Sequence, residues 1–200
     1  MVVMAETKML VDKTEYLTSG VHIGMKTCTP YMKKFVYKVR EDGLSVFNLK
    51  QVDEGIAVAS RFLARYGNVL AVTRQTNAKQ AVEEFAKHTG SKSICGRFSP
   101  GTLTNPSYKE FYEPDIILAV DPLVDEQVVK EAKKKRLPIV SLCDTFNSVK
   151  DIDLTVPANN NGKKSLALIF WILTREILKG RGTIKKDSDF KAKLKDFDSE

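Results

Sequence analysis

The sequence predicts an α/β domain in which a mostly parallel sheet lies between helices on both faces. Short β-branched or apolar runs alternate with longer amphipathic segments over most of the 200 residues. The run at residues 116–120 is continuously apolar, which is typical of a strand buried on both faces. This alternation implies right-handed β-α-β crossovers, and the length suits one domain with a sizeable core.

Before the first long helix, the sequence predicts one short helix and two short strands. The helix is expected at residues 9–17, before Gly20, and the strands at residues 35–39 and 44–47. Glu41-Asp42-Gly43 supplies turn-forming residues between the strands. We therefore expect a small unit that precedes the main sheet.

The first long helix is predicted to begin after Asn48. Its side chain can cap the helix, with Gln51 in the reciprocal position of a capping box. One apolar face follows at steps of four and three residues: Val52, Ile56, Ala59, Leu63 and Tyr66.

Strands and helices then alternate to residue 179. Strands are expected at residues 69–73, 91–95, 116–120, 139–143 and 154–156, and helices at residues 77–88, up to about 135, and 162–179. Asp121 and Pro122 are expected to provide the cap and the first turn of the helix that reaches residue 135. Beyond Gly180 large apolar residues are few, so we expect one domain at residues 1–182 and a mobile or partner-ordered charged tail at residues 183–200.

Composition favours a polyanionic partner without proving one. Lys and Arg total 32 against 25 Asp and Glu, a formal net charge of +7. Neutralising phosphates releases counterions, although a merely soluble basic protein has the same balance. The three cysteines are scattered and form no C-x-x-C pair, so we expect reduced thiols in a cytoplasmic protein. Charged residues interrupt the N-terminus, and residues 166–173 are too few to span a bilayer, so neither a signal peptide nor a membrane partner is expected.

The segment at residues 96–106 combines a basic side chain with turn-forming and hydroxyl residues. Pro100-Gly101 suits the central positions of a type II turn. Arg97 is expected to meet a phosphate, while Thr102 and Asn105 add hydrogen bonds or hold the loop's shape. The loop contains no nucleophile, base or metal ligand, so it indicates binding and no reaction.

Motifs of nucleotide enzymes fail in this chain. No G-x-G-x-x-G follows a predicted strand, and the Walker A lookalike before Ser165 has Pro157 and Lys164 at positions that require Gly and Ser or Thr. Lys163 and Lys164 are expected instead at an exposed helix start, free to reach phosphates. His22 and His88 lack the companions of a metal site. We therefore expect no catalytic residue, no metal, no cofactor and no small-molecule substrate.

A second basic stretch carries interleaved aromatic residues. Tyr31, Phe35 and Tyr37 alternate with five cations: Lys26, Lys33, Lys34, Lys38 and Arg40. Such mixtures suit RNA, where exposed bases stack and the backbone needs positive charge, but a solvated hairpin with ordinary lysines has the same pattern. The run at residues 133–136 is ambiguous, because cations are favoured at a helix C-terminus in any case.

Several long motifs in order resemble the small-subunit ribosomal protein uS2 family, in its archaeal and eukaryotic branch, with an archaeal member indicated. The similarity extends from about Tyr16 to Gly182. The motifs are Ser19-Gly20-Val21-His22-Ile23-Gly24, the 96–106 loop, Glu113-Pro114-Asp115-Ile116 with Thr145, and residues 157–162 leading into Ile169-Phe170-Trp171. Two positions depart from the family pattern, each losing a cation: Gln80, and Leu123 with Val124.

The resemblance implies a flavodoxin-like, three-layer domain that binds small-subunit (16S) rRNA between head and body, beside neighbouring ribosomal proteins. The link from Asn105 to Pro114 is too short for the coiled-coil insertion of the bacterial branch, and the acidic tail of animal relatives is absent. We expect a non-enzymatic constituent of the small subunit that supports translation. The alternatives are a nucleotide-dependent α/β enzyme and a protein-interaction module without direct RNA contact.

Overall fold

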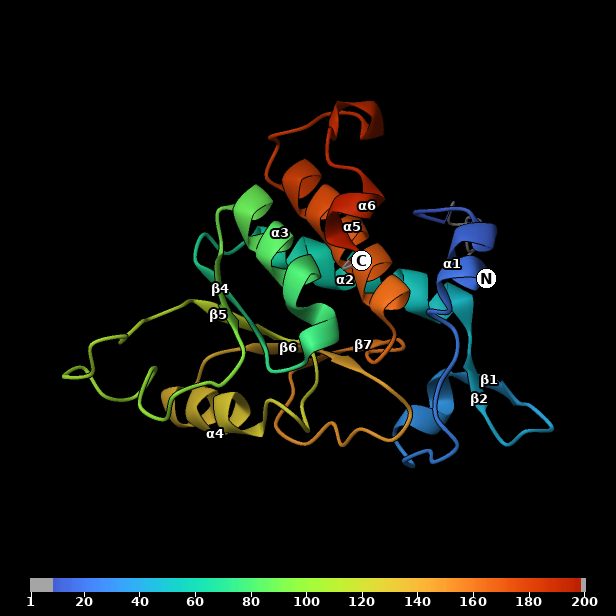
Figure 1. Cartoon of the computed structure of the whole chain (residues 1–200), viewed down its shortest axis with the longest axis horizontal. Helices are drawn as coiled ribbons and strands as arrows, with labels where there is room; N and C mark the ends of the chain where they lie inside the picture. The colour runs from blue at the N-terminus through green and yellow to red at the C-terminus, as the bar shows by residue number, and fades with distance from the viewer. Residues whose placement is uncertain (1–8, 199–200) are drawn as a thin grey trace, which may run out of the picture.

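A five-stranded parallel sheet forms the centre of the computed structural model, which describes residues 9–198 (Figure 1). Its strands are β3 (Val69–Thr73), β4 (Lys92–Cys95), β5 (Ile116–Ala119), β6 (Ile139–Cys143) and β7 (Leu154–Pro157). They lie in the order β4-β3-β5-β6-β7, and every pairing is parallel. Numbered within this sheet the order is 2-1-3-4-5, so the expected flavodoxin-like topology is confirmed.

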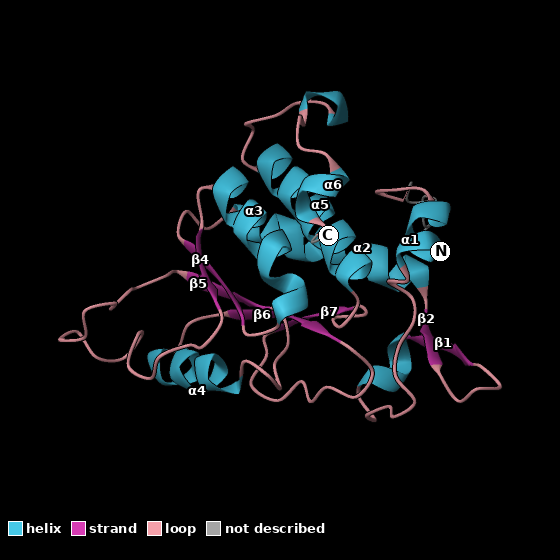
Figure 2. Ribbon diagram, viewed as in Figure 1, coloured by secondary structure: helices cyan, strands magenta, loops and turns pink. Residues whose placement is uncertain are grey.

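Helices cover both faces of the sheet (Figure 2). The helices α2 (Leu49–Ala64), α3 (Lys79–Thr89) and α5 (Lys163–Gly180) lie on one face, and α4 (Glu126–Lys135) lies on the other. The two-residue period of a strand divides β3 between two cores. Val69 and Ala71 join the larger core, whereas Leu70 and Val72 pack in the core that contains residues of α4.

A hairpin precedes the sheet in the chain. It consists of β1 (Val36–Val39) and β2 (Ser45–Phe47), which pair antiparallel, and it follows α1 (Lys13–Ser19) and the 3-10 helix η1 (Met32–Phe35). Gly20 ends α1 with a φ of 71°, a left-handed conformation that glycine adopts without steric cost. The helix begins four residues later than expected, and the Leu10 N–H before it donates to Asp53 Oδ1 at 3.0 Å.

Of the two hydrogen bonds of the capping box expected at α2, one forms and the prediction of the other is wrong. The Asn48 side chain caps the helix by accepting from the Lys50 N–H at 3.1 Å. Its own backbone N–H donates to Phe35 O at the end of η1 at 2.9 Å, so the donor that Gln51 would have used is already engaged. The helix also ends at Ala64, before Tyr66.

The start of α4 differs from the prediction as well. The helix begins at Glu126, so Asp121 and Pro122 lie in the preceding turn. The Asp121 carboxylate accepts from the Leu123 N–H at 2.9 Å and from the Asn147 amide at 2.9 Å. Asp121 therefore stabilises the end of β5 rather than the first turn of a helix.

The C-terminal segment, for which the sequence predicted a mobile or partner-ordered tail, packs on the helical layer of the domain. After the 3-10 helix η3 (Asp187–Asp189), the short α6 (Leu194–Phe197) contacts α3 and α5. Phe197 is only 1% exposed, and Trp171 Nε1 donates to Ala192 O at 2.9 Å. The division at residue 182 stays a prediction, and residues 1–8, which include part of the stretch used to reject a signal peptide, lie outside the described residues.

Among residues 9–198, none of the helices has both the length and the apolar character that crossing a bilayer requires. The apolar run at residues 166–173 lies inside α5, and most of it is buried in the domain core.

Candidate nucleic-acid interface

The structure gathers the predicted cations of residues 26–40 around the hairpin. Lys33 and Lys34 lie in η1, Lys38 lies on β1 and Arg40 follows it, and all four are exposed. The exposed Lys26 belongs to the same unit, since a Cβ atom added at Gly43 in the hairpin turn would lie 3.9 Å from its side chain. Five cations within fifteen residues therefore share one compact unit.

Aromatic rings accompany these cations, as the sequence indicated. Lys34 Nζ lies 3.7 Å from the centroid of the Tyr31 ring and 4.8 Å from that of Phe35. Tyr31 and Tyr37 are both exposed. A cation over an aromatic face is attracted to it, so Lys34 is held at the surface by rings that a nucleic-acid base can also approach.

The loop after β4 presents Arg97 at another place. Gly96 adopts a φ of 104°, and its N–H donates to Thr73 O at 2.7 Å. The exposed Arg97 and Arg74 line a hollow of about 300 Å³ that also borders α4. The expected turn is present, because Gly101 has a φ of 97° and the Thr102 N–H donates to Ser99 O at 3.3 Å.

Glu131 on α4 holds this loop in place, a role that the sequence analysis did not predict. Its carboxylate is 3% exposed and accepts from the Gly101 N–H at 2.8 Å and the Leu103 N–H at 3.2 Å. The signal was weak: Glu131 is an acidic residue beside Ala132 on the apolar face of a lysine-rich helix. Burial of a carboxylate against backbone donors fixes the loop's shape.

Thr102 and Asn105 use their side chains within the loop. Thr102 is 2% exposed, and its hydroxyl donates to Ser99 O at 2.8 Å. The Asn105 side chain is exposed, but its Oδ1 accepts from the Ser107 N–H at 3.1 Å. Of the two roles expected for Thr102, the structure supports shaping the loop, whereas Asn105 keeps an exposed face.

The predicted cations form separate groups. The hairpin and the 96–112 loop lie at opposite ends of the long axis of the molecule (Figure 1). Lys163 and Lys164 are exposed at the start of α5, as expected, and Asn159 Oδ1 accepts from the Gly162 N–H before the helix at 3.2 Å. A single partner that contacts all of these groups must therefore extend across the domain.

A buried polar network closes the carboxyl edge of the sheet, where flavodoxin-like folds bind ligands. Asp121 Oδ2 accepts from the Gln75 amide at 3.0 Å, and the Asn160 amide donates to Asn147 Oδ1 at 3.0 Å and to Leu142 O at 3.2 Å. Burial raises the pKa of Asp125 to about 7. The polar groups at this edge bond mainly to one another, an arrangement that serves structure.

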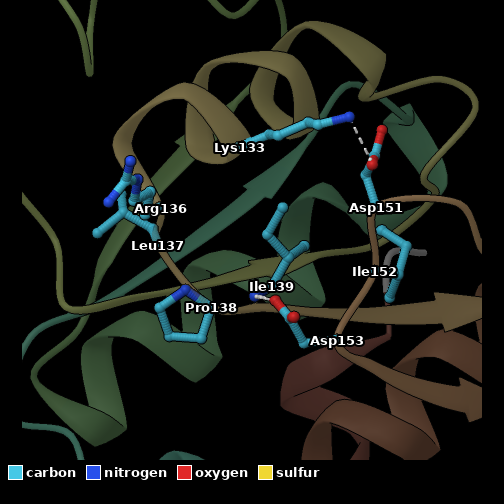
Figure 3. Close-up of a pocket in the computed structure, with 8 residues that line it drawn as sticks. All are labelled: Lys133, Arg136, Leu137, Pro138, Ile139, Asp151, Ile152 and Asp153. Carbon is cyan, nitrogen blue, oxygen red and sulfur yellow. Dashed lines mark hydrogen bonds and ion pairs between the residues drawn. The ribbon is translucent and has the colours of Figure 1, made fainter.

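A further hollow of about 440 Å³ lies between the C-terminal end of α4 and the loop before β7 (Figure 3). Its carboxylates are engaged, since Lys133 pairs with Asp151 at 2.7 Å and Asp153 accepts from the Ile139 N–H at 2.8 Å. Arg136 lies on the other side of the hollow from both carboxylates (Figure 3). The interactions drawn here stabilise the junction of α4 with the sheet.

The part of the chain that the structure describes, residues 9–198, contains three cysteines and two histidines. In that part, no three or more His, Cys, Asp or Glu side chains are placed to hold a metal ion. Cys28 and Cys95 are half-buried and Cys143 is buried; burial raises the pKa of Cys95 to about 11 and that of Cys143 to about 12. Both groups are therefore thiols at neutral pH, as expected of near-core cysteines.

Fold and surface together define a doubly wound α/β domain whose exposed cations suit a polyanionic ligand. The family model described as "Ribosomal protein S2" matches residues 16–110 and 108–180. The chain therefore belongs to the ribosomal protein S2 family, in agreement with the resemblance seen in the sequence.

Individual relatives are similar over nearly the whole chain. The small ribosomal subunit protein uS2 of Staphylothermus marinus is 46% identical over 193 residues, which are 96% of this chain and 88% of the relative. The protein of the same name from Picrophilus torridus is 43% identical over 197 residues, 98% of each chain. That from Thermoplasma volcanium is 44% identical over 98% of this chain and 99% of its own.

Proposed function

We propose that this chain is a structural constituent of the small ribosomal subunit and binds small-subunit rRNA between head and body, supporting translation. A member of the ribosomal protein S2 family in this role works in the cytoplasm. The observation that carries the rRNA contact is the clustering of five exposed cations and exposed aromatic rings in the hairpin unit. Neither catalysis nor a cofactor forms part of the proposal.

The hairpin cations supply the principal contact. Lys26, Lys33, Lys34, Lys38 and Arg40 neutralise phosphates, because an ion pair between an exposed cation and RNA releases condensed counterions. Arg97 and Asn105 make a second contact from the opposite end of the domain, and Lys163 and Lys164 make a third. Neighbouring ribosomal proteins cover other surfaces, including the C-terminal segment beyond Gly180.

Sedimentation of a native lysate tests the assignment. The chain is expected to migrate with the small subunit at low salt and to be released only at high salt. Migration as a small free species at low salt would contradict the proposal.

Replacing Lys33 and Lys34 by Ala tests the hairpin contact. For purified chain and small-subunit rRNA, the slope of log affinity against log salt is expected to fall by up to about one unit per lost phosphate contact. The matched control replaces Lys87 and Lys130, which are exposed and pair with Glu84 and Glu126 on their own helices, so the net charge changes equally. An unchanged slope in the Lys33/Lys34 variant would remove both residues from the interface.

A further inference from the structure

A hollow of about 790 Å³ lies between α1, the β1–β2 hairpin and the first turn of α2. Its size falls within the range of sites that hold a small ligand, roughly 300–1,000 Å³. Apolar side chains of Leu17, Val46 and Phe47 form part of the wall. The hollow is therefore large enough and apolar enough to receive a flat ring.

Charge around the hollow is of one sign. Lys13, Lys38, Arg40 and Lys50 line it, and no Asp or Glu does. Within residues 9–198, Arg40 pairs with Asp42 at 3.1 Å, and no carboxylate pairs with the three lysines. The hollow therefore favours a ligand that joins an apolar ring to an anionic group.

A β-bulge places an exposed aromatic ring beside this hollow. Val36 pairs with Phe47 and Lys38 pairs with Val46, so Tyr37 is an extra residue between two registered pairs. In a regular strand adjacent side chains point to opposite faces, yet Tyr37 and Lys38 both line the hollow. Tyr37 is 71% exposed, so its ring is free to stack on a ligand.

His22 contributes a polar atom without a partner. Its carbonyl accepts from the Phe47 N–H at 2.8 Å, which fixes the residue beside β2. Its Nδ1 is buried and has no hydrogen-bond partner among the described residues, and the side chain lines the hollow. Buried polar atoms ordinarily have a hydrogen-bond partner, so a water molecule or a ligand group that reaches the imidazole can complete this site.

We infer that this hollow holds one unpaired nucleotide of the rRNA. The base stacks on Tyr37 with an edge toward His22, while Lys38 and its neighbouring cations contact the flanking phosphates. Sequence-specific RNA recognition uses unstacked bases in this way, with aromatic platforms and base-edge hydrogen bonds. The inference rests on the proposed function and adds to it the RNA feature that this face recognises.

Tyr37→Ala tests the stacking contact. Affinity for small-subunit rRNA is expected to fall about tenfold or more, because stacking of a base on an aromatic ring contributes strongly to single-strand binding. The salt slope should not change, since no charge is lost, and Tyr37→Phe should retain wild-type affinity. Chemical probing of the complex should show one unpaired nucleotide that wild type protects and Tyr37→Ala leaves reactive.

Val39→Ala is the matched control, because Val39 is an exposed residue of the same strand that does not line the hollow. If wild type binds rRNA with normal salt dependence and Tyr37→Ala binds with the same affinity, this inference is overturned and the proposed function stands. Wild type that fails to bind would refute the proposed function itself. A free nucleotide is a second possible ligand of the hollow, and titration with nucleoside monophosphates tests it. If a monophosphate binds saturably and requires Tyr37, while Tyr37→Ala leaves rRNA affinity unchanged, the hollow binds a free nucleotide and the inference is overturned.

Discussion

Glu131 shows how one buried side chain prepares a surface loop. Its two oxygens accept from backbone N–H groups of Gly101 and Leu103 and from the Gln127 amide at 2.8 Å. A neutral isostere would present an NH₂ group to one of the backbone donors. Because the site is buried, water cannot supply the missing acceptor.

Glu131→Gln is therefore expected to reduce the free energy of unfolding by about 1–3 kcal/mol. Hydrogen exchange at the amides of Gly101 and Leu103 should accelerate, and urea unfolding should report the loss of stability. Glu126→Gln is the control, since Glu126 lies on the same helix in an exposed pair with Lys130. Unchanged exchange at both amides would show that the carboxylate does not hold the loop.

The packing of α2 against α5 depends on a close approach at their C-terminal ends. A Cβ atom added at Gly180 would lie 2.7 Å from the Cβ of Ala64. Alanine has a helix propensity better than that of glycine by roughly 1 kcal/mol, but overpacking costs about 1–3 kcal/mol. Ala64 packs against the larger core, and the Arg181 guanidinium, which follows Gly180, donates to Tyr66 O at 2.8 Å. The two helix ends are therefore held together, so the steric term is expected to prevail.

Gly180→Ala should therefore destabilise the domain by about 1–2 kcal/mol in thermal or urea unfolding. Adding Ala64→Gly removes the opposing methyl group, so a double-mutant cycle should show favourable coupling between the two changes. Gly67→Ala is a control, because nothing lies within 4 Å of a Cβ atom at Gly67. Strictly additive effects of the two substitutions would contradict close contact between the helices.

The C-terminal segment around α6 packs against the helical layer. Phe197 stacks on His88 with ring centroids 6.1 Å apart, and the Gln80 amide donates to Asp196 O at 2.9 Å. Removal of a buried phenyl ring from a core costs about 3–5 kcal/mol. A terminal segment can instead detach while the sheet stays folded, which limits the loss of global stability.

Phe197→Ala is expected to lower global stability by less than about 3 kcal/mol while it releases the segment near α6. Trp171 is the single tryptophan, and its indole bonds to Ala192 in that segment, so its fluorescence should shift to the red. Leu194→Ala in the same helix is the control, because Leu194 is partly exposed. Emission like that of wild type would show that Phe197 does not hold the segment in place.

Much of the architecture followed from local pattern. The strand at residues 69–73 and that at 139–143 have the predicted bounds, because apolar β-branched runs of this length are buried wherever the sheet forms. The order of the five strands came only from the family resemblance, since periodicity carries no information about which strands become neighbours. Errors fell at Gln51 and Asp121: Phe35 O takes the Asn48 N–H that Gln51 was expected to accept from, and the Asn147 amide bonds to the Asp121 carboxylate.

Residue types and spacing were enough to establish the fold class and the family, and they predict which cations a polyanion would meet. Contacts between distant segments settled which polar groups remain available: Thr102 is buried, Glu131 holds the loop, and a bulge directs Tyr37 beside Lys38. The physical reason is that hydrophobic period is a local property of the chain. Hydrogen-bond satisfaction and side-chain direction depend instead on what folding brings alongside.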